Sequence, residues 1–321
     1  MESYCKLSIL KLKIFLSKRP LDLYVRLSES KYVKVASKDT PNPIDTLDDY
    51  SKKGLNSLYV KFEDFNNLMV DIESNINNSL EKIDEYSGIN QQYDGLADLL
   101  EDTKSLVVNL GISEFTVQHV DNLIQKTIYS FSKWDSIETL TELLFKKNEY
   151  IKSHALLCSF IATSVLENVD WSSESIKRKV IMASLFQNIC LDREDHAKIY
   201  SRDEDAFNRL DTYEKDRVLI HPQKAAKLLD YGEFTGFEVA AMVKSHHELP
   251  GGVGFPRGQQ DSSNLSPLET LFIISAYFAH RVLISDPKKF DFNREVQDLN
   301  EVFYEGQFKK NFEYFLKTFR T

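Results

Sequence analysis

The pattern of apolar and polar residues changes near residue 65 of this 321-residue chain. Before that point, the stretches 22–28 and 31–37 alternate apolar and polar side chains, with "ESK" between them as a turn, which predicts a β-hairpin. A short helix is predicted over 46–54, with Thr46 as its N-cap and Gly54 as its stop. The stretch 57–62 predicts a third strand. We therefore expect a small α+β domain over residues 1–65.

From residue 63 onward the spacing of apolar residues is helical. Apolar residues between 65 and 83 recur three or four positions apart, which gives one apolar helix face. Two further helices are predicted, one over 96–110 that ends at Gly111 and one over 113–133 with Ser113 as its N-cap. We expect a helical connector over 66–134 and an all-α domain over 135–321, in which Ser172 or Ser173 caps a helix. The apolar helix face over 65–83 could also pack against a second copy of the chain and so form a homodimer.

Composition narrows the classes of function. The net charge of −9 and the pI near 5.4 argue against a nucleic-acid partner, which would require a basic surface. No apolar run approaches the length of about 18 residues that a membrane span needs, and the N-terminal stretch does not resemble a signal peptide. The three widely spaced cysteines (Cys5, Cys158 and Cys190) are expected to be buried free thiols in a reducing compartment. We therefore expect a cytoplasmic protein that binds neither membrane nor nucleic acid.

Histidines are the residues with the clearest potential for chemistry. Of the seven, His119 and His196 have polar neighbours and are expected at the surface, whereas His280 ends an apolar helix and is expected to be packed. His221 precedes Pro222, which suits the first turn of a helix. Four histidines lie in or at the end of predicted helices: His154, His221, His246 and His247. Imidazoles that converge from several helices can form a metal site, and each could equally be a packed core residue.

Four segments of the chain resemble segments of the HD-GYP family and occur in the same order along the sequence. The stretch "HHELPGGVGFPRG" (246–258), followed by "LSPLETLFIISAYFAH" (265–280), is similar to its signature, with Phe255 in place of the tyrosine. "HPQKAAKLL" and "IKSHALLCSFIATSVLEN" are similar to two other family segments, so the resemblance covers roughly 150–290. It implies a helical HD phosphohydrolase fold, hydrolysis of cyclic di-GMP at a centre of two or three metal ions, and metal binding by the four histidines named above.

The carboxylates that this resemblance requires are replaced. Gln187 and Asn188 stand where the family has histidine and aspartate, Leu191 replaces its lysine, Tyr277 replaces a metal-binding aspartate, and Tyr150 replaces a glutamate found in some members. Bridging carboxylates offset the charge of paired divalent ions and help to hold the attacking hydroxide, and a neutral amide does neither well. Four neutral imidazoles suit at most one transition-metal ion.

We therefore expect a catalytically inactive HD-GYP-like module for signalling or protein interaction, with a protein partner and no cofactor beyond one transition-metal ion. One alternative is a receptor that binds cyclic di-GMP without hydrolysing it. However, "DPKKF" places Asp286 beside Lys288 and Lys289, where the family carries a basic phosphate-binding segment. The other alternative is an active phosphodiesterase with an atypical metal set. Metal content and calorimetry with cyclic di-GMP distinguish these hypotheses.

Overall fold

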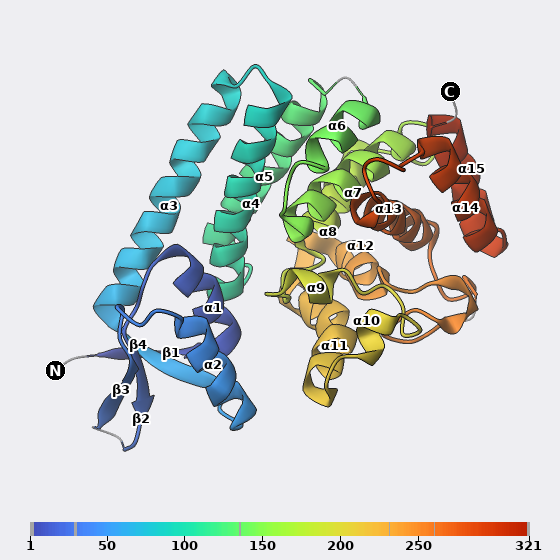
Figure 1. Cartoon of the computed structure of the whole chain (residues 1–321). Helices are drawn as coiled ribbons and strands as arrows, with labels where there is room; N and C mark the ends of the chain where they lie inside the picture. The colour runs from blue at the N-terminus through green and yellow to red at the C-terminus, as the bar shows by residue number, and fades with distance from the viewer. Residues whose placement is uncertain (1–2, 29–30, 135, 231, 260, 320–321) are drawn as a thin grey trace.

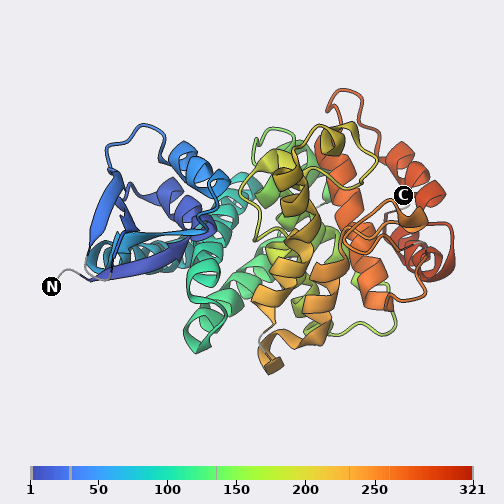
Figure 2. The same ribbon diagram turned by 90° about the horizontal axis from the view of Figure 1, so that it is seen from below.

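The computed structural model describes residues 3–28, 31–134, 136–230, 232–259 and 261–319. A small antiparallel sheet lies near the N-terminus, and the rest of the chain is helical, which confirms the expected fold class in outline (Figure 1). Seen from below, the N-terminal part and the C-terminal helices lie at opposite ends of the molecule (Figure 2).

The N-terminal unit is a four-stranded sheet with two helices. Its strands lie in the order β1-β4-β2-β3 and all pair antiparallel. The predicted hairpin is confirmed as β2 and β3, and the third predicted strand is β4; the turn expected at residues 29–30 lies outside the described residues. The pattern did not predict β1 or α1. The elements are β1 (Tyr4–Ser8), α1 (Ile9–Lys18), β2 (Leu23–Arg26), β3 (Tyr32–Ala36), α2 (Pro43–Lys52) and β4 (Ser57–Lys61).

The start of α2 differs from the prediction. The helix begins at Pro43, with Asn42 as the N-cap residue, and not at Thr46. Proline suits the first helical position because its fixed φ is already helical and the amide hydrogen that it lacks would have no partner there. Gly54 follows the helix with a positive φ of 85°, as expected of a residue that ends a helix.

Four helices connect the sheet to the C-terminal half: α3 (Phe62–Glu85), α4 (Ile89–Leu110), α5 (Glu114–Phe131) and α6 (Ile137–Leu144). The apolar face of α3 is buried and α3 packs along α4, so the face that suggested a homodimer is covered within the same chain. Ser113 caps α5 in a capping box with Thr116, and Gly111 ends α4, both as predicted.

The helical domain is formed by the remaining elements. Helix α7 packs against α8 and α13, and α12 packs against α8, α11 and α13. Ser173 is the residue that caps α8. The elements are α7 (Tyr150–Leu166), α8 (Glu174–Phe186), α9 (Glu194–Ala197), α10 (Asp205–Asn208), α11 (Thr212–Leu229), α12 (Gly232–Ser245), the 3-10 turn η1 (Pro250–Gly252), α13 (Pro267–Ile284), α14 (Phe292–Val302) and α15 (Gly306–Phe319).

The fold shows where the most apolar helix and the three cysteines lie. Among the described residues, α13 alone is long and apolar enough to cross a membrane by length and composition, although the sequence pattern did not single it out. Because 67% of that helix is buried inside the protein, it has the character of a core helix. All three cysteines are free thiols; Cys158 is buried, and Cys5 and Cys190 are half-buried.

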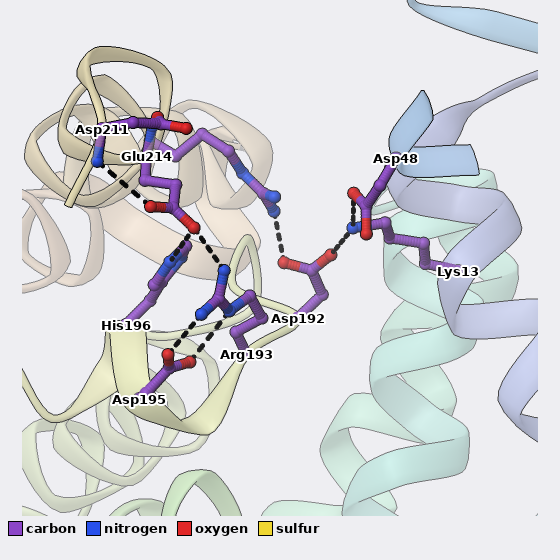
Figure 3. A network of polar contacts seen from close by, with 9 residues as sticks. Lys13, Asp48, Asp192, Arg193, Asp195, His196, Asp211 and Glu214 are labelled. Atoms are coloured by element: carbon purple, nitrogen blue, oxygen red, sulfur yellow. Dashed lines mark hydrogen bonds and ion pairs between the residues drawn. The ribbon is translucent and has the colours of Figure 1, made fainter. Parts of the chain in front are cut away.

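A buried ion-pair network joins the N-terminal unit to the helical domain (Figure 3). Lys13 of α1 bonds both Asp48 of α2, at 2.8 Å, and Asp192, at 2.6 Å. Asp192 lies between α8 and α9 and also pairs with Arg217 of α11. The side chains of Lys13 and Asp192 are only 6% and 9% exposed, so their pairing is shielded from solvent. This network fixes the N-terminal unit against the helical domain.

Candidate metal centre

Three of the four predicted ligand residues meet in the core of the helical domain. His221 belongs to α11, and His246 and His247 directly follow α12. One ring nitrogen from each of the three lies within 4.8 Å of the others, and all three side chains are buried. We call this set the histidine triad.

Local backbone geometry orients two of these rings. Pro222 lies inside α11, not in its first turn as predicted. Because proline has no amide hydrogen, it leaves the carbonyl of Val218 without its helical partner, and Nδ1 of His221 donates to that carbonyl at 2.7 Å. At the end of α12, where the last carbonyls also lack helical partners, Nδ1 of His246 donates to Val243 at 2.6 Å.

This arrangement leaves ring nitrogens whose lone pairs accept no hydrogen bond. A carbonyl only accepts, so both Nδ1 atoms carry the proton and both Nε2 atoms carry a lone pair. The Nε2 atoms of His221 and His246 lie 3.4 Å apart. His247 has no hydrogen-bond partner on either ring nitrogen among the described residues. Histidines that bind a metal ion through one nitrogen usually donate the other N–H to a carbonyl or carboxylate, as His221 and His246 do. With these two Nε2 atoms and an unpartnered nitrogen of His247, the triad offers a donor set that fits a metal ion.

Burial also favours the metal-binding form of the triad. Desolvation lowers the pKa of His221 to about 4, and it lowers the pKa values of His246 and His247 well below the usual range, with the neighbouring imidazoles adding to the effect. All three rings are therefore neutral at pH 7, the form in which imidazole binds metal. No cysteine or carboxylate joins the triad in the part of the chain that the structure describes.

His154 does not join the triad. Its Nε2 lies 2.9 Å from the carbonyl oxygen of Ala276 and 2.8 Å from the hydroxyl of Tyr200. Its Nδ1 lies 3.3 Å from the amide nitrogen of Gln187, which also donates to Ser184. With Nε2–H donated to the carbonyl and Nδ1 accepting from Gln187, both nitrogens of His154 are occupied by protein partners.

Sequence reasoning missed Tyr200, which separates His154 from the triad. Its ring is 1% exposed, and its centroid lies 4.2 Å from the rings of both His247 and His280. Its backbone and that of Ser201 donate to the carboxylate of Glu204, which fixes this segment. Tyr200 lies in a polar loop stretch, so the sequence pattern gives no signal that its side chain turns into the core.

The other histidines were predicted with mixed success. His280 is packed, as expected, and its Nδ1 lies 2.7 Å from the hydroxyl of Tyr150. The prediction that His119 and His196 lie at the surface is wrong, since they are 8% and 1% exposed. Polar neighbours do not reveal which face of a helix packs inward, and the short helix α9 turns His196 toward Glu214, 3.7 Å away.

The loop that follows the triad covers it. Glu248 is 1% exposed, and its carboxylate accepts hydrogen bonds from the backbone of Arg257 and Gln259 at 2.8 and 3.0 Å. Phe255 stacks on His247 with ring centroids 4.3 Å apart. Gly254 is required here, because a Cβ would lie 2.1 Å from the carbonyl oxygen of His247. Together with Tyr200, this loop leaves the triad histidines 0–1% exposed.

The positions that depart from the family pattern do not restore a carboxylate. Gln187 bonds His154, as described above, and Asn188 lines a different cavity between the two parts of the chain. Tyr277 is half-buried, with its ring centroid 5.8 Å from that of Tyr200. On the stretch expected to replace the basic segment, Lys289 lies 3.8 Å from Asp286 and is well exposed.

The comparisons with known proteins concern the fold. No protein-family model matches this chain, and no curated protein matches it. Among solved structures, the chain is similar to Bd1817, an HDG"Y"P protein from Bdellovibrio bacteriovorus, with a TM-score of 0.51 and 12% sequence identity. The likeness covers 98% of this chain and 100% of that one, so it includes the N-terminal unit. This chain therefore shares the overall fold of an HD-GYP protein.

Proposed function

We propose that this chain is a non-catalytic HD-GYP-like signalling module that acts through a protein partner. The observation that carries the proposal is the donor set of the triad, which offers three neutral imidazoles and no carboxylate among the described residues. Hydrolysis of a phosphodiester by two metal ions requires anionic ligands that bridge the ions and offset their charge. The HD-GYP fold of the chain is consistent with descent from such an enzyme.

Access to the triad supports the same proposal. A catalytic metal site keeps an open coordination position that substrate or water can reach. Here Tyr200 and Phe255 cover the triad, and both rings are at most 1% exposed. A phosphodiester could not contact these histidines unless both the Tyr200 segment and the loop after His247 moved.

One transition-metal ion is part of the proposal, held by His221, His246 and His247. It would act as a structural group that is coordinated by the lone pairs of three converging imidazoles. Of the four ligands expected from the sequence, His154 is omitted because protein partners occupy both of its nitrogens.

Metal analysis combined with an activity assay tests the proposal. The purified chain should carry no more than one equivalent of transition metal and should leave cyclic di-GMP intact after prolonged incubation with added Mn²⁺, Fe²⁺ or Zn²⁺. His247→Gln should lose the metal, whereas His280→Gln, a buried histidine outside the triad, should retain it. Two or more equivalents of metal together with turnover of cyclic di-GMP would show that the chain is an enzyme.

A further inference from the structure

One face of the N-terminal sheet (Figure 1) is both aromatic and basic. Side chains alternate between the two faces along each strand, so the register of the paired strands shows which residues share a face. One tyrosine and one cation from each strand lie together on this face: Tyr4, Lys6, Tyr24, Arg26, Tyr32, Lys34, Tyr59 and Lys61. The four strands contain no aspartate or glutamate. We call these eight residues the tyrosine–lysine face.

The opposite face of the sheet packs on the helices. There Leu58 of β4 is 1% exposed and belongs to the hydrophobic core that includes residues of α1 and α3. Among the described residues of that core there is none of the four tyrosines, which pack on one another instead. The rings of Tyr4 and Tyr32 are stacked with centroids 4.0 Å apart, and Tyr24 and Tyr59 meet this pair edge-on at 5.1 and 5.2 Å. The tyrosine–lysine face is therefore turned away from the helical core.

The charge of this region is opposite in sign to that of the whole chain. Residues 1–38 carry nine lysines and arginines against three aspartates and glutamates, although the chain has a net charge of −9. Lys6, Arg26 and Lys34 are exposed on the tyrosine–lysine face, and Lys34 pairs with Asp22, which precedes β2. Carboxylates accept hydrogen bonds from both ammonium and phenol groups. The face is thus complementary to an acidic partner.

The edge of the sheet beside this face offers backbone groups for pairing. Strand β3 is the last strand of the sheet, and Leu27 donates to the carbonyl of Lys31 at 2.8 Å. Because hydrogen-bonded pairs alternate along an antiparallel ladder, the backbone groups of Tyr32 and Lys34 point away from β2. They make no hydrogen bond within the described ranges. An added strand could pair with them, and its side chains would alternate between the tyrosine–lysine face and the side of Val33, which is 39% exposed.

Two other partners suit this surface less well. The bases of a single-stranded nucleic acid stack on open aromatic rings, whereas Tyr4 and Tyr32 cover each other's ring faces. A long polyanion would also be repelled by the negative charge of the rest of the chain. A second copy of β3 would bring its own cations onto the same face, and like charges across a strand pair are unfavourable.

We propose that the edge of β3 and the tyrosine–lysine face bind an extended acidic segment of a partner protein, in which carboxylate and apolar residues alternate. The carboxylates lie over the face near Lys34, and the apolar side chains lie beside Val33. This inference names the chemistry of the partner in the proposed function and rests on that function in this respect. Peptide binding and metal content are separate measurements, so either proposal can fail while the other stands.

Fluorescence polarisation with the full chain tests this surface. A labelled heptapeptide of alternating glutamate and valine should bind saturably, and its lysine–valine counterpart should bind roughly tenfold more weakly. Because alternate amides of a strand point to opposite sides, N-methylation of only the glutamates or only the valines should abolish binding in one case and spare it in the other. Lys34→Glu should weaken binding roughly tenfold. The matched control is Lys288→Glu, which changes an exposed lysine of the helical domain and should alter affinity less than about twofold.

Three results would overturn the proposal. The first is the absence of saturable binding for the alternating glutamate–valine peptide and for a longer peptide of the same pattern. The second is unchanged affinity in a Lys34→Glu variant that circular dichroism shows to be folded, or an equal loss of affinity for both N-methylated peptides. The third is tighter binding of oligothymidylate than of the acidic peptide, or a dimer of the chain that the peptide dissociates. These last outcomes would assign the surface to a nucleic acid or to a second copy.

Discussion

Acid should unfold this protein because its core holds neutral imidazoles. Burial lowers the pKa of His154 and His221 from 6.5 to about 4. The unfolded chain takes up these protons near pH 6.5, whereas the folded chain takes them up only near pH 4. The stability that these histidines confer is therefore complete above pH 6.5 and is lost as the pH falls to about 4. Each accounts for roughly 3 kcal/mol, so the pair accounts for a large part of a total that is typically about 5–15 kcal/mol.

Urea unfolding in EDTA, followed by tryptophan fluorescence between pH 7.5 and 5, measures this effect. Around pH 5.3 the free energy of unfolding should fall by at least about 2.7 kcal/mol per pH unit, two protons' worth. His246, His247 and His280 shift in the same direction and steepen the slope. In His221→Gln the slope should be lower by about 1.4 kcal/mol per pH unit. A free energy of unfolding that stays constant from pH 6.5 to 5 would refute the reasoning, because the folded imidazoles would then titrate like exposed ones.

Three substitutions test other parts of the fold by urea unfolding at pH 7.5. Gly254→Ala places a Cβ against the carbonyl oxygen of His247 and should cost about 3 kcal/mol; a cost below about 1 kcal/mol would mean that the loop relaxes easily. Tyr200→Phe removes a buried hydroxyl with two partners and should cost about 1 kcal/mol, so an unchanged midpoint would argue against those bonds. Asp192→Asn breaks the buried interdomain network and should cost about 3 kcal/mol, whereas the exposed Asp205→Asn should cost less than about 0.5 kcal/mol; equal losses would contradict the role of burial.

The sequence predicted most reliably the elements that local rules specify. The hairpin of β2 and β3 follows from alternation, and the capping box at Ser113 and the stop at Gly111 follow from backbone hydrogen bonding at helix ends. Strand β1 was missed because its pairing partner β4 lies about fifty residues away in sequence, where no local pattern reports it. The start of α2 was misplaced because Thr46 and Pro43 are both acceptable near a helix start, and the turn before the helix selects between them.

For the candidate site, the sequence by itself identified the residue types and their resemblance to HD-GYP segments, including His221, His246, His247 and the absence of the expected carboxylates. Tertiary structure alone decided which imidazoles converge, because that depends on how α11, α12 and α13 pack. It brings three of them together, satisfies His154 through α13, and places Tyr200 in the space between. The burial and pairing of a side chain are fixed by elements that lie far from it in sequence.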